Sequence, residues 1–243
     1  MTDADSAKRL ICAIDTAELE TAVSLAASLV DVVGAIKLGL EFYTAHGPAG
    51  VTEVSRCGLP VFLDLKYYDI PNTVAGAIRG SAALNPFMMT VHVAGGPAMM
   101  RAAMAASFRL ADRNGANRPL VVGITVLTSF DDGDVDAVGM KGPLADQVHR
   151  LADLALDNGL DGVVASAHEI ADLRSQCGAD FTLVVPGIRP AWSSADDQKR
   201  IVTPAEAIRR GADYLVVGRP ITRADDPAAA ARRVIGEMVS GAG

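Results

Sequence analysis

Four charged residues, Asp15, Lys37, Asp64 and Lys66, stand at or near the ends of three short apolar runs early in the chain. Side chains two residues apart on a strand share a face, so Asp64 and Lys66 should point the same way. Buried charges are costly unless they are paired, and an alternating series of carboxylates and ammonium groups would pair them. Such a series would hold Lys66 as a positioned ammonium acid, suited to delivering one proton beside a developing negative charge.

Each of these residues, taken singly, also has a structural explanation. A lysine in a barrel strand is often half of a structural ion pair, and an aspartate that closes a strand is often a helix cap. The four charges nevertheless end three successive apolar runs, and Asp69 adds a further carboxylate three residues after Lys66. This clustering favours a functional role over four separate structural ones.

A second group of candidate residues lies late in the chain. Arg189 follows the apolar run that ends at Val185, and Gly218 and Arg219 follow the run that ends at Val217. Barrels of alternating strands and helices often bind phosphate with the loops after strands seven and eight. A glycine allows close approach of the backbone, and an arginine can hold a phosphate with two hydrogen bonds. A Gly-Arg-Pro turn can also be an ordinary loop, so its position after the eighth run is what favours an anion site.

The elements that would position these residues recur as an apolar run followed by a segment of helical composition. The runs are Leu10–Ile14, Ala35–Leu40, Val61–Leu65, Phe87–Val93, Leu120–Leu127, Gly162–Ala165, Thr182–Val185 and Tyr214–Val217. The segments of helical composition are Ala17–Leu29, Gly47–Arg56, Val74–Ala83, Met99–Leu110, Pro143–Asp157, His168–Gln176, Pro204–Arg210 and Pro227–Met238.

Strands that are apolar throughout and alternate with helices indicate a parallel sheet covered on its outer face. Eight such units in 243 residues predict an α/β fold, a closed (β/α)8 TIM barrel formed by residues 1–243 as a single domain. An open, doubly wound sheet is the main alternative. The longest interruption, the Asp-rich segment 128–142, is expected to be a loop after the fifth strand. In a barrel, catalytic residues sit at the carboxyl ends of the strands.

The composition limits the classes of partner. The formal net charge of −7 argues against general binding to nucleic acid or an anionic membrane, so positive charge for an anionic ligand must be local. The N-terminal residues are acidic and polar and lack the pattern of a signal peptide. No apolar stretch reaches the roughly 18 residues that a membrane span needs. We therefore expect a soluble, cytoplasmic protein.

Cofactor and metal motifs are missing from the sequence. The three cysteines, Cys12, Cys57 and Cys177, fit neither a disulfide framework nor a zinc site and are expected to be small buried hydrophobic residues. No dinucleotide fingerprint or Walker A motif is present. His92, within an apolar run, is expected to be a structural histidine rather than a catalytic base. The other histidines, His46, His149 and His168, are expected at the surface.

Residues 64–73, Asp-Leu-Lys-Tyr-Tyr-Asp-Ile-Pro-Asn-Thr, closely resemble the signature Asp-x-Lys-x-x-Asp-Ile-Pro-x-Thr of orotidine 5'-monophosphate (OMP) decarboxylases. Further matches to the family, several of them typical of its bacterial branch, are Ile14-Asp15, Lys37-Leu-Gly39, residues 91–96, Leu127-Thr-Ser129, residues 186–190, Asp197-Gln198 and residues 218–222. The resemblance covers nearly the whole chain. It implies a (β/α)8 barrel and a homodimer with sites at the subunit interface. The implied activity is decarboxylation of OMP to UMP in pyrimidine biosynthesis, with no metal and no cofactor.

The resemblance also implies a role for each matching residue. Lys66 would protonate C6 of the substrate after carbon dioxide leaves. Asp64, near the departing carboxylate, would complete a catalytic array with Lys37 and with Asp69 of the partner subunit. The implied substrate-binding residues are Asp15 and Lys37 for the ribose, Thr73 of the partner subunit on the same side, Thr128 for the pyrimidine, Gln198 between base and phosphate, and Arg189, Gly218 and Arg219 for the phosphate.

Two other functions compete with this one. Related barrels, the 3-keto-gulonate-phosphate decarboxylases and hexulose-phosphate synthases, share the Asp-x-Lys-x-x-Asp core but hold magnesium with it. The following Ile-Pro-Asn-Thr, together with Arg189 and Gln198, favours the nucleotide enzyme. A non-catalytic nucleotide-binding barrel is the rival from another class, and the complete set of charged residues argues against it because unneeded buried charges are costly.

Overall fold

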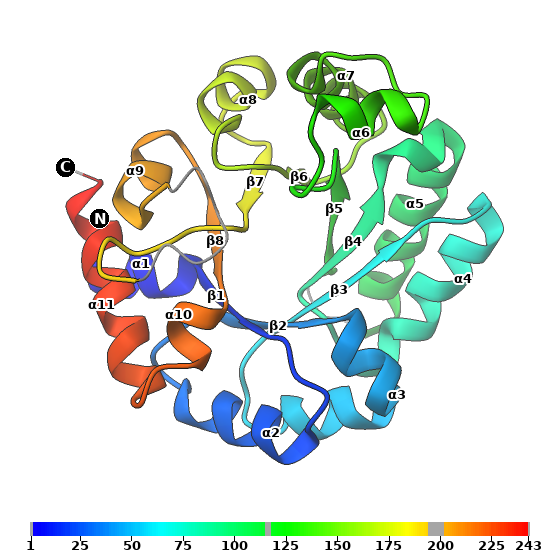
Figure 1. The fold of residues 1–243 in the computed structure, drawn as a ribbon. Coiled ribbons are helices and arrows are strands. Elements are labelled where there is room, and N and C mark those ends of the chain that lie inside the picture. The colour runs from blue at the N-terminus through cyan, green and yellow to red at the C-terminus, as the bar shows by residue number, and fades with distance from the viewer. Residues whose placement is uncertain (1, 115–117, 194–201, 243) are drawn as a thin grey trace.

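The computed structural model describes residues 2–114, 118–193 and 202–242, and its fold is a closed barrel of parallel strands ringed by helices (Figure 1). The strands are β1 (Leu10–Ile14), β2 (Ala35–Gly39), β3 (Val61–Tyr67), β4 (Met88–His92), β5 (Leu120–Ile124), β6 (Gly162–Val164), β7 (Thr182–Val185) and β8 (Tyr214–Val217). Each strand pairs with its neighbours in sequence, and β8 pairs with β1. This closure confirms the predicted (β/α)8 barrel and rules out an open sheet, which would leave two edges unpaired.

Helices cover the outer face of the barrel. They are α1 (Asp3–Arg9), α2 (Leu19–Ser28), α3 (Leu40–Ser55), α4 (Pro71–Gly80), α5 (Gly96–Asn114), α6 (Asp132–Ala137), α7 (Leu144–Asp157), α8 (Ile170–Cys177), α9 (Pro204–Arg209), α10 (Arg219–Thr222) and α11 (Pro227–Ser240), with 3-10 turns η1 (Ser81–Leu84) and η2 (Val93–Gly95). Their apolar residues recur at helical spacing, as Val74 and Ile78 do on α4, and are buried against the strands.

Side chains along each strand alternate between two cores. On β1, Ile11 and Ala13 face the barrel interior, whereas Leu10, Cys12 and Ile14 pack in the core between strands and helices. The interior cluster consists of Ile11, Ala13, Ala35, Phe62, Met88, Val122, Val184 and Val216. A polar residue placed two positions after an inward apolar residue therefore points into the mouth of the barrel.

Several elements differ from those that the sequence predicts. The sequence predicts no helix before the first strand, but α1 forms there with Thr2 as its N-cap. The Asp-rich segment after β5 contains α6, which Asp131 and Asp134 start with a reciprocal capping box. Helix α3 begins at Leu40 and kinks at Gly47, the residue at which the prediction starts it. These helices escape a search for apolar periodicity because caps and kinks, rather than long apolar faces, define them.

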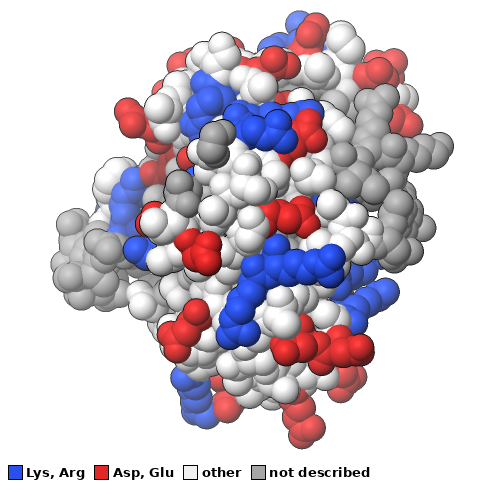
Figure 2. All heavy atoms as spheres, turned by 90° about the vertical axis from the view of Figure 1, so that its left-hand side faces the viewer, with Lys and Arg blue, Asp and Glu red and all other residues white. Residues whose placement is uncertain are grey.

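The surface carries charges of both signs. On the face that includes α11, Figure 2 shows acidic and basic side chains interspersed with uncharged ones. Within the described ranges, no helix is both long enough and apolar enough to cross a bilayer.

Gly162 provides a test of the barrel packing. A Cβ at this position on β6 would lie 2.0 Å from the carbonyl oxygen of Thr182 on β7. We expect Gly162→Ala to lower the free energy of unfolding by about 1–3 kcal/mol, because the backbone of a paired strand must move. In the control Gly236→Ala on α11, the new Cβ meets no atom within 4 Å, and alanine should stabilise the helix by about 0.5–1 kcal/mol. Urea unfolding measures both, and an unchanged Gly162→Ala protein would contradict the close approach.

Candidate active site

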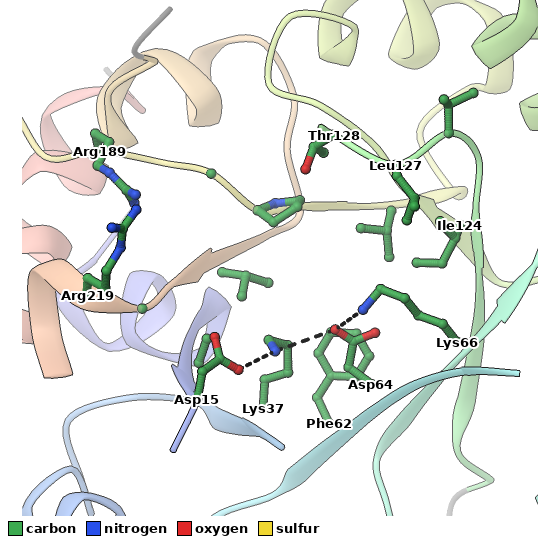
Figure 3. A pocket seen from close by; sticks show the side chains of 17 residues that line it. Asp15, Lys37, Phe62, Asp64, Lys66, Ile124, Leu127, Thr128, Arg189 and Arg219 are labelled. Atoms are coloured by element: carbon green, nitrogen blue, oxygen red, sulfur yellow. Dashed lines mark hydrogen bonds and ion pairs between the residues drawn. The ribbon is translucent and has the colours of Figure 1, made fainter. Parts of the chain in front are cut away.

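The four charged residues singled out in the sequence meet at the mouth of the barrel (Figure 3). The ammonium nitrogen of Lys37 lies 3.1 Å from Asp15 Oδ1 and 3.5 Å from Asp64 Oδ2. The ammonium group of Lys66 donates to the same Asp64 oxygen at 2.8 Å. We call these four residues the charged array. Carboxylates and ammonium groups alternate along it in the order that the sequence predicts.

Strand register brings the array together. Lys37 and Asp64 each follow an inward-facing residue, Ala35 on β2 and Phe62 on β3, by two positions, and so share the inner face. The register pairs Gly39 with Asp64. A Cβ on Gly39 would lie 3.3 Å from the Lys37 ammonium nitrogen. Glycine at this position therefore leaves room for the ion pairs.

Lys66 departs from regular strand geometry. Its φ is +50°, in the left-handed region, and the pairing of β3 with β4 shifts register between Leu63 and Tyr67. The Lys66 N–H donates to the hydroxyl of Thr90 at 2.8 Å, and that hydroxyl donates to Asp64 Oδ1 at 3.0 Å. The contact between the Lys66 and Asp64 side chains confirms that they share a face, although the backbone at Lys66, near the end of β3, is irregular.

Asp64 is the buried centre of the array. Its side chain is 10% exposed, compared with 29% for Lys66 and 57% for Asp15. Burial raises the pKa of Asp64, but the charges of Lys37 and Lys66 and the hydrogen bonds from Lys66 and Thr90 together lower it more, so that the pKa lies below its ordinary value. Asp64 is therefore an anion at neutral pH, held between two cations.

The array forms one wall of a cavity of about 330 Å³, a size that suits a small-molecule ligand. Much of the remaining wall is apolar and consists of Ala13, Phe62, Ile124, Val126, Leu127, Val164, Pro186 and Val216. Strand β5 ends at Ile124 instead of the predicted Leu127, so residues 126–128 line the cavity from a loop. Thr128, the residue expected to meet a pyrimidine, lies in this loop.

Arg189, Gly218 and Arg219 line the cavity after β7 and β8, as their positions in the sequence suggest. Gly218 is the N-cap residue of α10. The guanidinium groups of Arg189 and Arg219 face each other at one side of the cavity (Figure 3). Two cations directed at a common space favour an anion between them, and guanidinium groups bind phosphate oxygens with paired hydrogen bonds.

Helix α11 holds the segment that follows Arg189. The N–H of Ala191 donates to a carboxylate oxygen of Glu237 at 3.2 Å. The guanidinium carbon of Arg233 lies 4.5 Å from the centre of the Trp192 ring, within the range of a cation–π contact. These residues lie outside the cavity, and no motif in the sequence points to them. Their contacts tie the start of the loop after β7 to the last helix of the chain.

Two of the predicted site residues are not brought into the cavity of the single chain. Asp69 and Thr73 are exposed and are not among the described residues that line it. One Asp69 carboxylate oxygen accepts a hydrogen bond from the Ile70 N–H at 2.6 Å, and Thr73 lies in the first turn of α4. Gln198 lies outside the described residues.

His92 lies at the end of β4, close to the array. Its ring centre is 5.6 Å from that of Tyr68. Burial lowers the pKa of His92, the charge of Lys66 lowers it further, and Asp64 only partly opposes these effects. A neutral ring packed on an aromatic side chain agrees with the structural role that the sequence suggests.

The other histidines agree only in part with the expected surface positions. His168 is exposed. His46 and His149 are half-buried instead: His46 Nε2 lies 2.7 Å from the carbonyl oxygen of Ala17, and a ring nitrogen of His149 bonds the side-chain oxygen of Gln176. Their polar atoms find partners across neighbouring elements, which apolar patterning alone does not reveal.

Cysteines and acidic residues form no evident metal centre in the part of the chain that the structure describes. No three His, Cys, Asp or Glu side chains there are grouped as metal ligands. Cys12 is buried as expected, whereas Cys57 and Cys177 are half-buried, and all three are free thiols.

Comparison with known proteins gives one consistent result. A model of the orotidine 5'-phosphate decarboxylase / HUMPS family matches residues 8–234. The chain is 54% identical over 226 residues to the orotidine 5'-phosphate decarboxylase of Paramagnetospirillum magneticum, covering 93% of this chain and 96% of that one. It is 56% identical over 228 residues to the enzyme of the same name from Rhodospirillum rubrum, with 93% and 92% covered.

A solved structure shows the same likeness. The crystal structure of orotidine 5'-phosphate decarboxylase from Lactobacillus acidophilus superposes with a TM-score of 0.83 at 35% sequence identity. The match covers 94% of this chain and 98% of that chain. The similarity thus extends over nearly the full length of both proteins, in sequence and in fold.

Proposed function

The chain belongs to the orotidine 5'-phosphate decarboxylase / HUMPS family, and we infer that it converts OMP to UMP and carbon dioxide. It is thus an enzyme, a carbon–carbon lyase of pyrimidine biosynthesis. The observation that carries the inference to particular residues is the layout of the cavity, which has the charged array on one side and two arginines on another.

The order of side chains along the cavity supports one orientation of the nucleotide. In Figure 3 the labelled residues run from Arg189 and Arg219, past Asp15 and Lys37, to Asp64 and Lys66. An OMP molecule has its phosphate at one end, its ribose in the middle and its carboxylated pyrimidine at the other end. The arginines and Gly218 therefore bind the phosphate, and Asp15 and Lys37 bind the ribose hydroxyls.

Lys66 acts as the proton donor in this orientation. The bond between C6 and the carboxylate carbon breaks, carbon dioxide leaves, and the electron pair stays on C6. C6 then takes a proton from the Lys66 ammonium group, and the resulting amine is reprotonated from solvent. Asp64 lies beside the departing carboxylate and holds Lys66 in place through their 2.8 Å hydrogen bond.

Electrostatic stabilisation is the main demand of this reaction. The carbanion at C6 is of vinyl type and has no adjacent carbonyl group to delocalise it. A fixed ammonium group in a site that excludes water can stabilise such a charge without reorganising during the reaction. The apolar wall of the cavity supports this, because it lowers the local dielectric around the array. Binding of the distant phosphate supplies free energy for ordering the site.

The remaining predicted residues also contact the substrate in this proposal. Thr128 contacts the pyrimidine from the loop after β5. Gln198 bridges base and phosphate. Neither a metal nor a cofactor takes part in the scheme, which distinguishes it from the magnesium-dependent sugar-phosphate barrels. The enzyme works in the cytoplasm, where OMP and UMP are its small-molecule partners.

A homodimer completes the site in this proposal. Asp69 and Thr73, which stay outside the cavity of one chain, would reach the cavity of the partner subunit. The surface beside them supports this, because Tyr68 and Ile70 are 63% and 67% exposed and flank Asp69. Leu40, the first residue of α3 directly after β2, is 55% exposed. Large exposed apolar side chains of this kind are typical of a protein interface.

Replacement of Lys66 tests the proposed chemistry. We expect Lys66→Ala to lower kcat by about a thousandfold or more, because both the proton donor and the fixed cation are lost. Loss of OMP absorbance measures turnover with and without EDTA, and Lys8→Ala, at an exposed lysine of α1, is the matched control. Chelator-sensitive turnover of the wild type would instead point to the magnesium-dependent barrels. A folded wild type without turnover would exclude the function.

Arg219→Ala tests the phosphate site. Charge-assisted hydrogen bonds to phosphate are each worth enough to change kcat/KM by about 10- to 100-fold, so we expect a fall of at least that size. Turnover should fall as well as binding, since phosphate binding helps to order the site. Arg223→Ala, at an exposed arginine that does not line the cavity, is the control. Unchanged rates at both low and saturating OMP would remove Arg219 from the site.

Mixing two inactive variants tests the shared site. Lys66→Ala and Asp69→Ala should each be inactive as homodimers. If each site combines Lys66 of one subunit with Asp69 of the other, a mixed dimer contains one intact site and one doubly altered site. After subunit exchange in an equal mixture, roughly a quarter of wild-type activity should return, as random pairing of two subunits gives. Activity that stays at the level of the separate variants would place both residues in the same subunit's site.

A further inference from the structure

Thr90 is a buried polar residue beside the charged array that the proposed mechanism leaves without a role. It lies on β4 and is fully buried. Its neighbours Met89 and Val91 pack in the outer core, whereas Met88, two residues earlier, faces the barrel interior. Thr90 therefore shares the inner face of β4 with Met88 and points towards β3 at the level of Asp64.

The Thr90 hydroxyl joins two parts of the array. A hydroxyl has one proton to donate, and here that proton goes to Asp64 Oδ1 at 3.0 Å. Its lone pair accepts the Lys66 N–H at 2.8 Å. Because Oδ1 is taken by a neutral donor, Oδ2 is the oxygen that accepts from Lys66 Nζ at 2.8 Å and contacts Lys37 at 3.5 Å. The hydroxyl thereby fixes the rotation of the carboxylate.

We propose that Thr90 is a positioning residue for decarboxylation, whose single hydroxyl fixes the Asp64 carboxylate and the Lys66 backbone relative to each other. The proposal rests on the proton-donor role proposed above for Lys66. Thr90 does not line the cavity and need not touch substrate. Its effect reaches C6 only through the placement of Lys66 and Asp64.

The backbone of Lys66 explains why such a contact is needed. A left-handed φ is unfavourable for a lysine and persists only where surrounding contacts hold it. The register shift between β3 and β4 takes this residue out of the regular strand pairing, and the Thr90 hydroxyl accepts its N–H instead. A valine at position 90 would fill the same volume and supply neither hydrogen bond.

The same contact contributes to the pH dependence. The charged groups facing Asp64 are Lys37 from β2 and Lys66 from β3, while His92 at the end of β4 lies close enough to feel both Asp64 and Lys66. Burial raises the pKa of Asp64, the charges of Lys37 and Lys66 and the hydrogen bond from Lys66 lower it, and the hydrogen bond from Thr90 lowers it further. Its loss should raise that pKa, so that activity fails at a higher pH on acidification.

The test compares Thr90→Val with Thr90→Ser, which keeps the hydroxyl. We expect Thr90→Val to lower kcat by about 10- to 100-fold, the effect of losing a hydrogen bond to a charged group, with KM changed by less than about threefold. The acid limb of its kcat profile should move to higher pH. Thr90→Ser should recover most of the activity and the wild-type profile. Thr125→Val is the matched control, since Thr125 is also buried, lies next to β5, and bonds only the carbonyl oxygen of Val164 among the described residues.

Affinity for the product UMP, measured by calorimetry, separates positioning from misfolding. A Thr90→Val protein that binds UMP like the wild type, yet turns over slowly with a shifted acid limb, supports the proposal. Wild-type kcat and profile in Thr90→Val, or an equal loss in Thr125→Val, overturns it. If Thr90→Val does not fold, Thr90→Cys, of similar size and with a weak donor, takes its place with the same outcomes. A wild type without OMP turnover overturns both this role and the proposed function, whereas a Thr90→Val protein with the kcat and pH profile of an active wild type overturns this role alone.

Discussion

One buried anion, the carboxylate of Asp64, determines how the mouth of this barrel is built. A carboxylate with so little exposure is tolerable only because cations and hydrogen-bond donors surround it. Lys37 must arrive from β2 and Lys66 from the end of β3, which requires the parallel register of those strands. The array is therefore a property of the closed barrel as a whole, and any shift of one strand against the next would leave a charge without its partner.

The positive charges at the two ends of the cavity are arranged differently. The chain as a whole has a net charge of −7, which repels an anionic nucleotide at long range. Arg189 and Arg219 supply positive charge locally, where a phosphate can meet both guanidinium groups. At the other end, the ammonium groups are partly neutralised by Asp64, so their charge acts at short range and in a fixed direction. In the proposed function, attraction of the phosphate and the chemistry at C6 thus take place at opposite ends of the ligand.

Much of the site follows from simple periodicities in the sequence. The two-residue repeat of a strand predicts that Asp64 and Lys66 share a face, and the order of apolar runs places Arg189 and Arg219 after the last two strands. Both arrangements are seen in the structure.

Other features depend on contacts that no local pattern encodes. In the sequence, Thr90 is simply one residue of an apolar strand. In the structure, the register shift of β3 brings the Lys66 N–H to its hydroxyl. The contact between Ala191 and Glu237 joins residues 46 positions apart. Helix α1 is too short to show an apolar period, and its cap is visible only once the helix is known. Sequence patterns thus predict which face of a strand a side chain occupies and the order of the strands. Hydrogen bonds between distant segments become apparent only in the folded chain.

The contacts of α11 have a consequence for how the enzyme is made by the ribosome. The whole charged array is encoded within the first 66 residues, yet the segment after Arg189 is held by Arg233 and Glu237 on the last helix. Domains fold as units, with the N-terminal part of the chain available first during synthesis. The nascent protein therefore carries the array residues long before the helix that holds the segment after Arg189 has been made. Translation that stops only a few residues short of position 233 yields a chain with every array residue present and the anion end without its anchor.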